Sequence, residues 1–136
     1  MGIRREARET ALTILYLMDV SSLKQAEAED VVFKDNKLPD QITGFTKILV
    51  SGTAENIKII DDLITKQAKN WELSRMSAID RNILRIGTFE ILKTPETPIS
   101  VIINEAVEIA KKYSTSDSSK FVNGILDKFN VVRKKT

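Results

Sequence analysis

Apolar residues recur every three or four positions along almost the whole sequence, and this spacing is the feature that most limits the possible folds. The first such run begins at Ile3 and ends at Met18. Residues three and four apart share one face of an α-helix, whereas a half-buried strand alternates at every second residue, and no segment alternates in that way. Five glycines and three prolines are also few for the many turns of an all-β fold. The sequence therefore predicts an all-α protein, a single compact helical bundle of six to seven amphipathic helices that forms one domain over residues 1–136.

The middle of the chain continues this helical pattern with one interruption. A short acidic segment, residues 26–32, favours a weak helix, and residues 34–40 contain enough turn formers to predict a loop. A stronger apolar stripe begins near Asp40 and continues to Trp71. Gly52 interrupts the stripe, so we expect a bend there.

Start and stop signals divide the second half of the chain into helices. Ser77 followed three residues later by Asp80 is typical of a capping box, with a carboxylate in place of the usual Glu or Gln. Pro95 is expected to end the helix that begins there. Thr97 is expected to cap the next helix, with Pro98 in its first turn.

A polar link over residues 114–119 is expected to precede the last helix. The dipeptide Asn123-Gly124 usually indicates a hairpin turn, but apolar residues continue beyond it, which favours a helix. We therefore expect a close approach between backbones at Gly124. The same close helix packing is expected at Gly52 and Gly87.

Composition excludes several classes of function. The sequence contains neither cysteine nor histidine, which excludes disulfides, thiol proteases, histidine-dependent catalytic triads and zinc sites of Cys and His. The net charge of +2 is small despite a basic end at residues 133–135. Residues 1–9 are rich in charged side chains and have no apolar signal core. No apolar run approaches the roughly 18 residues of a membrane span. We expect a soluble, cytoplasmic protein that needs no membrane, metal or other cofactor.

Arginines gather at the start of the first predicted helix. Arg4 and Arg8 are four residues apart and share a face, and Arg5 lies beside them. Guanidinium groups suit phosphate oxygens and supply sequence-independent affinity for a nucleic acid backbone. The alternative is a solvated helix face on which Glu6 and Glu9 partly compensate the positive charge.

A second candidate for RNA binding lies near the other end of the chain. Residues 114–124 combine small hydroxyl side chains with Asp117, Lys120, Phe121 and Asn123. Unpaired bases stack on aromatic side chains and form hydrogen bonds with polar ones, so these residue types suit single-stranded RNA. The alternative is that Asp117 or a serine caps the helix while Phe121 belongs to the core.

Carboxylates offer only a weak case for catalysis. Asp61 and Asp62 are adjacent, and Glu105 and Glu108 are three residues apart, but such acids on helices are usually exposed. A helical di-metal site generally uses Glu-x-x-His pairs, which this chain lacks. No glycine-rich phosphate loop or dinucleotide motif occurs. We therefore expect no enzyme activity and assign no catalytic or metal-binding residue.

Four segments of the chain resemble the bacterial NusB family. Residues 4–16 resemble its RRxARExALxxLY opening. Residues 80–86 (DRNILRI) and 103–113 (INEAVEIAKKY) are similar to two of its helices, and residues 118–128 (SSKFVNGILDK) match its KFVNGxLDK ending almost letter for letter. The resemblance spans the chain in register, and the last two blocks are its most specific motifs. One departure is Ser119, where the family often has histidine.

The resemblance implies both a fold and a function. The fold would consist of two helical subbundles packed into one domain. Members of the family bind the boxA sequence of nascent ribosomal RNA leaders together with NusE, which is also a small-subunit ribosomal protein. This complex joins an antitermination assembly on RNA polymerase and supports complete synthesis of ribosomal RNA.

The resemblance also implies which residues bind each partner. The family's RNA contacts correspond to Arg4, Arg5, Arg8, Tyr16, Asp117, Lys120, Phe121 and Asn123. NusE is expected on the neighbouring helix surface, where the corresponding residues are Asp80, Arg81 and Arg85. In this arrangement arginines would bind phosphates, the two aromatic rings would stack on bases, and Asp117 would accept a hydrogen bond from a base edge.

Other classes of function stay open on the sequence alone. A helical module that binds only proteins would not need the arginines. An accessory domain of an RNA methyltransferase is a further alternative, because NusB-like domains also precede such enzymes, although no glycine motif of the enzyme itself is present. A monomer and a homodimer are equally compatible with the sequence.

Overall fold

The computed structural model describes residues 2–134, which form eight α-helices, one short 3-10 helix and no strand. The helices are α1 (Ile3–Val20), α2 (Gln25–Asp35), α3 (Asp40–Glu55), α4 (Ile57–Gln67), η1 (Leu73–Arg75), α5 (Ala78–Lys93), α6 (Ile99–Tyr113), α7 (Ser116–Asp127) and α8 (Phe129–Lys134). The all-α prediction is confirmed. The short α8 is additional, because the last predicted helix is interrupted at Lys128. No helix in this part of the chain is long and apolar enough to span a membrane.

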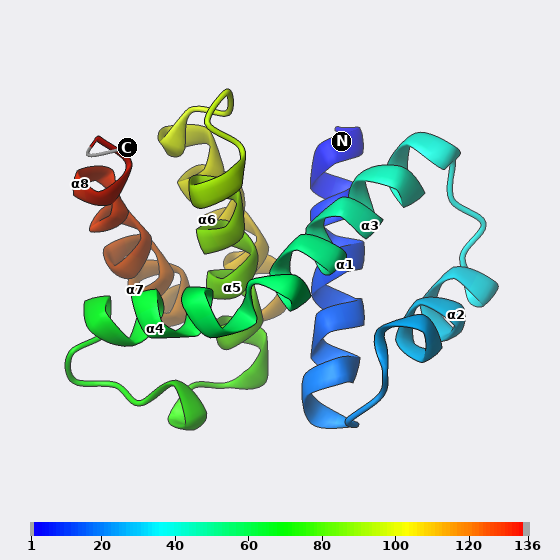
Figure 1. Cartoon of the computed structure of the whole chain (residues 1–136), viewed down its shortest axis with the longest axis horizontal. Helices are drawn as coiled ribbons and strands as arrows, with labels where there is room; N and C mark the ends of the chain where they lie inside the picture. The colour runs from blue at the N-terminus through cyan, green and yellow to red at the C-terminus, as the bar shows by residue number, and fades with distance from the viewer. Residues whose placement is uncertain (1, 135–136) are drawn as a thin grey trace.

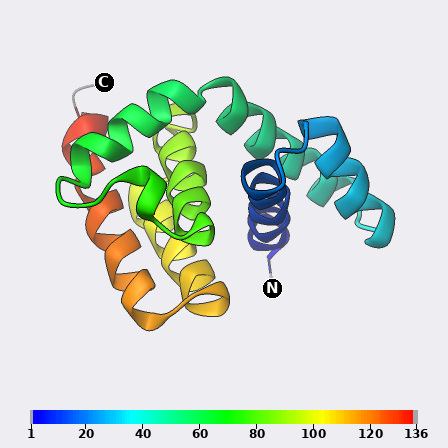
Figure 2. The same ribbon diagram turned by 90° about the horizontal axis from the view of Figure 1, so that it is seen from below.

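The helices form two groups that share one core (Figure 1). α1, α2 and α3 pack together on one side, and α4 to α8 form the other, with α5 at the centre of the second group. Figure 2, in which α1 is seen along its axis, shows the second group on one side of it and α2 on the other. One connected cluster of buried apolar side chains extends from Ala11 and Leu49 in the first group to Leu84 and Leu126 in the second. The two subbundles expected from the family resemblance are therefore present.

The break after the third helix lies at Asn56 and not at Gly52. α3 passes through Gly52 without interruption, so the predicted bend there is wrong. The Gly52 carbonyl accepts hydrogen bonds from both the backbone N–H of Asn56, at 3.2 Å, and its side-chain amide, at 2.7 Å, and these bonds hold the end of α3 at this residue. α4 then ends at Gln67, so Trp71 lies outside the predicted stripe and is 58% exposed.

The start of α5 agrees with the sequence, and that of α6 differs by one residue. The Ser77 hydroxyl accepts a hydrogen bond of 3.1 Å from the backbone N–H of Asp80, which confirms the predicted N-cap. Thr97 does not cap α6, because Pro98 occupies the capping position and no side chain accepts a hydrogen bond there.

Arg133 closes the C-terminal end of α5. Its guanidinium donates hydrogen bonds to the carbonyl oxygens of Ile91 at 3.0 Å and Thr94 at 3.1 Å. The last carbonyls of a helix have no partner within it, and a cation there also interacts favourably with the helix dipole. At least this residue of the predicted basic end therefore serves the fold, while Lys135 lies outside the described residues.

Two helical glycines lie tightly against a neighbouring helix. A Cβ atom at Gly52 would lie 2.2 Å from two ring carbons of Phe89, and one at Gly87 would lie 3.0 Å from Cδ1 of Leu126. Nothing lies within 4 Å of the corresponding position at Gly124. Close packing is therefore confirmed at Gly52 and Gly87, and the close approach predicted at Gly124 is wrong.

Gly52→Ala is expected to lower the free energy of unfolding by about 1–3 kcal/mol, because the new methyl group overlaps the Phe89 ring. Gly124→Ala is the matched control, since this exposed helical position has open space and alanine there should raise stability by about 0.5–1 kcal/mol. Urea denaturation followed by circular dichroism measures both. A Gly52→Ala protein as stable as the original would contradict the close contact.

Candidate nucleic-acid interface

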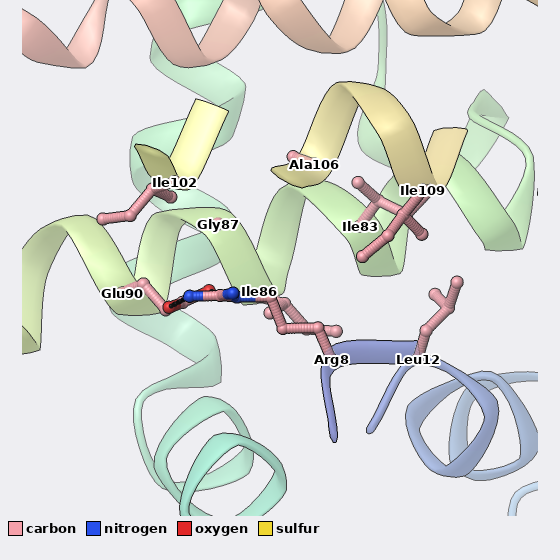
Figure 3. Close-up of a pocket in the computed structure, with 9 residues that line it drawn as sticks. All are labelled: Arg8, Leu12, Ile83, Ile86, Gly87, Glu90, Ile102, Ala106 and Ile109. Atoms are coloured by element: carbon pink, nitrogen blue, oxygen red, sulfur yellow. Dashed lines mark hydrogen bonds and ion pairs between the residues drawn. The ribbon is translucent and has the colours of Figure 1, made fainter. Parts of the chain in front are cut away.

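A buried ion pair joins α1 to α5 (Figure 3). Arg8 is 3% exposed and Glu90 is 2% exposed. The guanidinium donates from Nε to Glu90 Oε2 at 2.9 Å and from Nη2 to Oε1 at 2.7 Å, which is the bidentate geometry of strong arginine–carboxylate pairs. The solvated-face alternative is therefore wrong for Arg8, and its guanidinium is engaged within the fold.

Glu105 of α6 extends this ion pair to a second arginine. Arg5 donates two hydrogen bonds to the Glu105 carboxylate, and Arg8 Nη1 lies 3.4 Å from Glu105 Oε1. The hydrogen bonds from Arg5 lower the pKa of Glu105 below its ordinary value, although partial burial opposes this effect. Glu105 is therefore not the exposed acid that the sequence suggests. We call Arg5, Arg8, Glu90 and Glu105 the central ion-pair network, and it joins α1, α5 and α6.

Arg4 remains at the surface. It is exposed, and its guanidinium carbon lies 4.6 Å from the centre of the Phe45 ring of α3. A guanidinium above an aromatic ring keeps N–H donors at its edge, which can meet a phosphate oxygen. The three arginines predicted to bind RNA thus differ in access: Arg4 is exposed, Arg5 is half-buried and Arg8 is buried.

A second contact holds the end of α6 against α1. Glu9 Oε1 accepts hydrogen bonds from Lys112 Nζ and from the Tyr113 hydroxyl, each at 2.9 Å. Tyr16 is 37% exposed and lies two helical turns after Glu9 on the same face of α1. α7 begins shortly after Tyr113. The end of α6, which leads into α7, is therefore held against the face of α1 that carries Arg5 and Tyr16.

The first turns of α7 carry the predicted RNA residues from the end of the chain. Asp117, Lys120 and Asn123 are exposed. Thr115 caps this helix, because its hydroxyl accepts a hydrogen bond of 3.0 Å from the N–H of Ser118. The alternative in which Asp117 or a serine forms the cap is therefore wrong, and the Asp117 carboxylate is free of that role.

Phe121 packs partly against the core and partly against a surface aromatic. It is half-buried, and its ring meets that of Trp71 edge to face, with 5.6 Å between ring centres and 66° between planes. Each interpretation of Phe121 thus describes part of its surroundings. Sequence reasoning misses Trp71 as a candidate, because it assigns this residue to an apolar stripe. Its polar neighbours Asn70 and Glu72 are the signal that could have indicated a surface position.

Ser119 occupies the position at which the family often has histidine. It is 4% exposed, and its hydroxyl donates a hydrogen bond of 2.7 Å to the carbonyl of Ser116 in the same helix. In this chain the side chain at that position is therefore turned into the fold and away from the surface.

The two arginines predicted to contact NusE are engaged within the chain. Arg81 donates to Asp19 at 2.8 Å, and Arg85 donates to both carboxylate oxygens of Asp61 at 2.8 and 2.9 Å. Each arginine side chain is only 14% exposed. Burial raises the pKa of Asp19, but hydrogen bonds from Arg81 and Asn82 outweigh it and hold this pKa below its ordinary value. These residues connect α1, α4 and α5, and they leave little free charge for a partner.

Asp80, the third predicted NusE contact, connects α5 to α7. It is 8% exposed, and its Oδ2 accepts a hydrogen bond of 2.9 Å from the Ser118 hydroxyl. Within residues 2–134 the acidic side chains do not gather into any group of three or more that could hold a metal ion.

Comparisons with known proteins point to one family. The NusB family model matches residues 5–131. The chain is 42% identical over 135 residues to the transcription antitermination protein NusB of Desulforapulum autotrophicum, a match that covers 98% of this chain and 94% of that protein. T. maritima NusB has a similar structure, with a TM-score of 0.82 and 36% identity over 92% of this chain and 88% of that one. A crystal structure of the antitermination factors NusB and NusE in complex with dsRNA contains another similar chain, with a TM-score of 0.83 and 29% identity over 100% of this chain and 99% of that one.

Arg8→Met is expected to lower the free energy of unfolding by about 3–5 kcal/mol, because it leaves the Glu90 carboxylate buried without its partner. Arg5→Met is the matched change at the half-buried arginine, and its loss should be smaller because Glu105 keeps Arg8 and some contact with water. Urea denaturation compares the two variants. Equal losses would contradict a central role for the buried pair.

The central ion-pair network also predicts a loss of stability in acid. Because the pKa of Glu105 is lower in the folded chain than its ordinary 4.5, the ionised carboxylate stabilises the fold above that value, and this contribution is lost as the pH falls through the folded pKa. Glu105→Gln should therefore lose less stability than the original protein between neutral pH and about pH 3. Glu108→Gln, which alters a more exposed acid of the same helix, is the control. Urea midpoints across this range measure the effect, and an unchanged slope in Glu105→Gln would contradict it.

Proposed function

The chain belongs to the NusB family, and we propose that it is a transcription antitermination factor that binds boxA RNA of ribosomal RNA leader transcripts together with NusE, a small-subunit ribosomal protein. The family predicted from the sequence is confirmed by the family match, and the fold by the similar structure of T. maritima NusB. The names of the relatives and the complex of a similar chain with NusE and dsRNA support the proposed activity.

One observation carries the proposal for RNA. The contacts of Arg5 with Glu105 and of Glu9 with Lys112 and Tyr113 hold α6 along the face of α1 that carries Arg5 and Tyr16, and α7 follows shortly after Tyr113. We infer that the cations of α1, the exposed Tyr16 ring and the polar groups of α7 form one RNA-binding surface, because single-stranded RNA recognition combines these residue types. The proposed RNA contacts are Arg4, Arg5, Tyr16, Asp117, Lys120, Phe121 and Asn123.

The cations of this surface are not equivalent in what they offer a phosphate. Among the described residues, neither Arg4 nor Lys120 forms an ion pair with a carboxylate, so both can bind a phosphate without losing one. Arg5 would have to share its guanidinium with Glu105. Arg8 is left out of the contact set, and its proposed role is to hold α1 in place on α5.

NusE is proposed to bind around the start of α5, beside Asp80, Arg81 and Arg85. Since these side chains already hold α5 to α1, α4 and α7, their main contribution would be to set the shape of that surface. The complex would act in the antitermination assembly on RNA polymerase, in the cytoplasm, and no catalytic step is assigned to this chain. We also propose that the free protein can form a homodimer, which a measurement of its mass in solution would test.

A module that binds only proteins is the alternative, and one observation favours it in part. Arg5 and Arg8, two of the arginines that motivate the RNA interpretation, form ion pairs within the fold. If Arg4 and Lys120 also do not bind RNA, few of the predicted cationic contacts with RNA phosphates would remain.

Fluorescence anisotropy with labelled RNA tests the proposal. We expect boxA RNA to bind more tightly than a scrambled RNA of the same composition, NusE to strengthen this preference, and added salt to weaken binding. Equal, weak binding of both RNAs with NusE present would overturn the antitermination proposal in favour of the protein-binding module.

Lys120→Gln is expected to weaken the binding of boxA RNA and of scrambled RNA by a similar factor. It should also reduce the dependence of affinity on salt by about one phosphate contact. The reason is that a lysine binds the backbone and reads no base. Lys93→Gln, an exposed lysine at the far end of α5, is the matched control and should leave both affinities unchanged. Identical salt slopes for the two variants would remove Lys120 from the interface.

A further inference from the structure

A surface hollow lies where α7 meets the segment between α4 and α5. Its walls include Trp71 and Arg75 from that segment, Asp80 from α5, and Asp117 and Phe121 from α7. Three of these residues have no role in RNA binding under the proposed function: Trp71, Arg75 and Asp80. The hollow adjoins the proposed RNA surface, because Asp117 and Phe121 belong to both.

An exposed aromatic ring forms part of the lining of the hollow. Trp71 is 58% exposed, and its edge-to-face contact with Phe121 restrains it. The exposed part of this ring offers a face on which a planar group can stack. Nucleobases stack on such faces whatever their sequence, because every base has a π-face.

The lining of the hollow also includes hydrogen-bond acceptors. Asp80 is 8% exposed, and its Oδ2 accepts a hydrogen bond from Ser118, whereas its Oδ1 is buried and has no hydrogen-bond partner among the described residues. A buried acceptor without a donor is costly, so such an atom indicates a missing donor. The exposed Asp117 carboxylate is a second acceptor among the lining residues.

The charges favour a base over a phosphate inside the hollow. Two carboxylates, Asp80 and Asp117, would repel a phosphate group placed between them. Arg75 is the cation among these lining residues; its side chain is 80% exposed, and its ion pair with the exposed Glu72 is long, at 3.6 Å. Such a pair is weak, so Arg75 is available to a phosphate on the outer edge of the hollow.

We propose that this hollow binds one unpaired nucleobase of single-stranded RNA, stacked on Trp71, whose exocyclic amino group donates a hydrogen bond to the carboxylate of Asp80 or Asp117. The site would therefore prefer cytosine, adenine or guanine to uracil, which presents a carbonyl oxygen in place of the amino group. This inference rests on the proposed function, and it adds to it a base-selective site and three residues: Trp71, Arg75 and Asp80.

The single tryptophan of the chain makes the site directly observable. The intrinsic fluorescence of the folded protein is titrated with decamers of cytidylate and uridylate and with an abasic decamer of the same charge. We expect the cytidylate decamer to quench Trp71 and to bind about tenfold more tightly than the uridylate decamer, a difference that corresponds to one good hydrogen bond to a charged group. The abasic decamer should leave the fluorescence unchanged.

Variants separate the base contact from the general affinity for RNA. Asp80→Asn and Asp117→Asn should reduce the preference for cytidylate, with Asp117→Asn as the variant in which no buried group is altered. Asp62→Asn, an exposed acid on α4, is the control for the change of charge. Trp71→Leu should weaken binding of the cytidylate decamer about tenfold, as measured by the anisotropy of labelled RNA.

Each contrary outcome has a distinct meaning. Equal affinity for cytidylate and uridylate, with no change in either aspartate variant, overturns the amino-group contact. Binding of labelled boxA RNA with NusE that leaves Trp71 fluorescence unchanged overturns the hollow as a base site, and the proposed function then stands without it. Absence of binding to any RNA overturns the proposed function and this inference together.

Discussion

The relative position of the two helical groups depends on the central ion-pair network. Arg8 and Glu90 meet where α1 crosses α5, in a region otherwise lined by apolar side chains such as Leu12 and Ile86, and Glu105 adds α6 to the same contact. A buried guanidinium and carboxylate cost much solvation free energy, and two parallel hydrogen bonds offset this cost in one geometry only. The network therefore specifies how α1 lies on α5 and, through α6, where α7 begins.

Much of the charge in this chain holds helices together. Arg81 and Arg85 bind Asp19 and Asp61, and Arg133 binds the open carbonyls of α5. Arginine suits all of these sites, because its planar guanidinium presents several N–H donors in fixed directions and never loses its charge at physiological pH. A cluster of arginines in a helical sequence is therefore ambiguous evidence for nucleic acid binding, since the same residue type is preferred for buried pairs.

The proposed RNA surface follows from this use of charge. Where arginines are engaged within the fold, few cations remain to bind phosphates, and affinity from the RNA backbone alone would be modest. Recognition then depends more on aromatic faces and hydrogen bonds to bases, which Tyr16, Phe121 and the polar side chains of α7 offer. A protein of this kind benefits from a partner that adds its own contacts, and this agrees with a function exerted together with NusE.

The sequence by itself determined the fold class, most helix boundaries and the family. Periodic apolar residues specify helix faces locally, Ser77 caps its helix through contacts three residues away, and the NEAVEIAKKY and KFVNGILDK blocks need no structure to be recognised. Tertiary structure decided which polar residues are free. Arg4 and Arg8 share a helix face and a residue type, yet one lies over Phe45 at the surface and the other is buried against Glu90, because α5 covers only part of α1. Trp71 and Gly124 show the same limit: whether a residue is exposed or crowded depends on which distant helix packs beside it, and helical spacing carries no record of that partner.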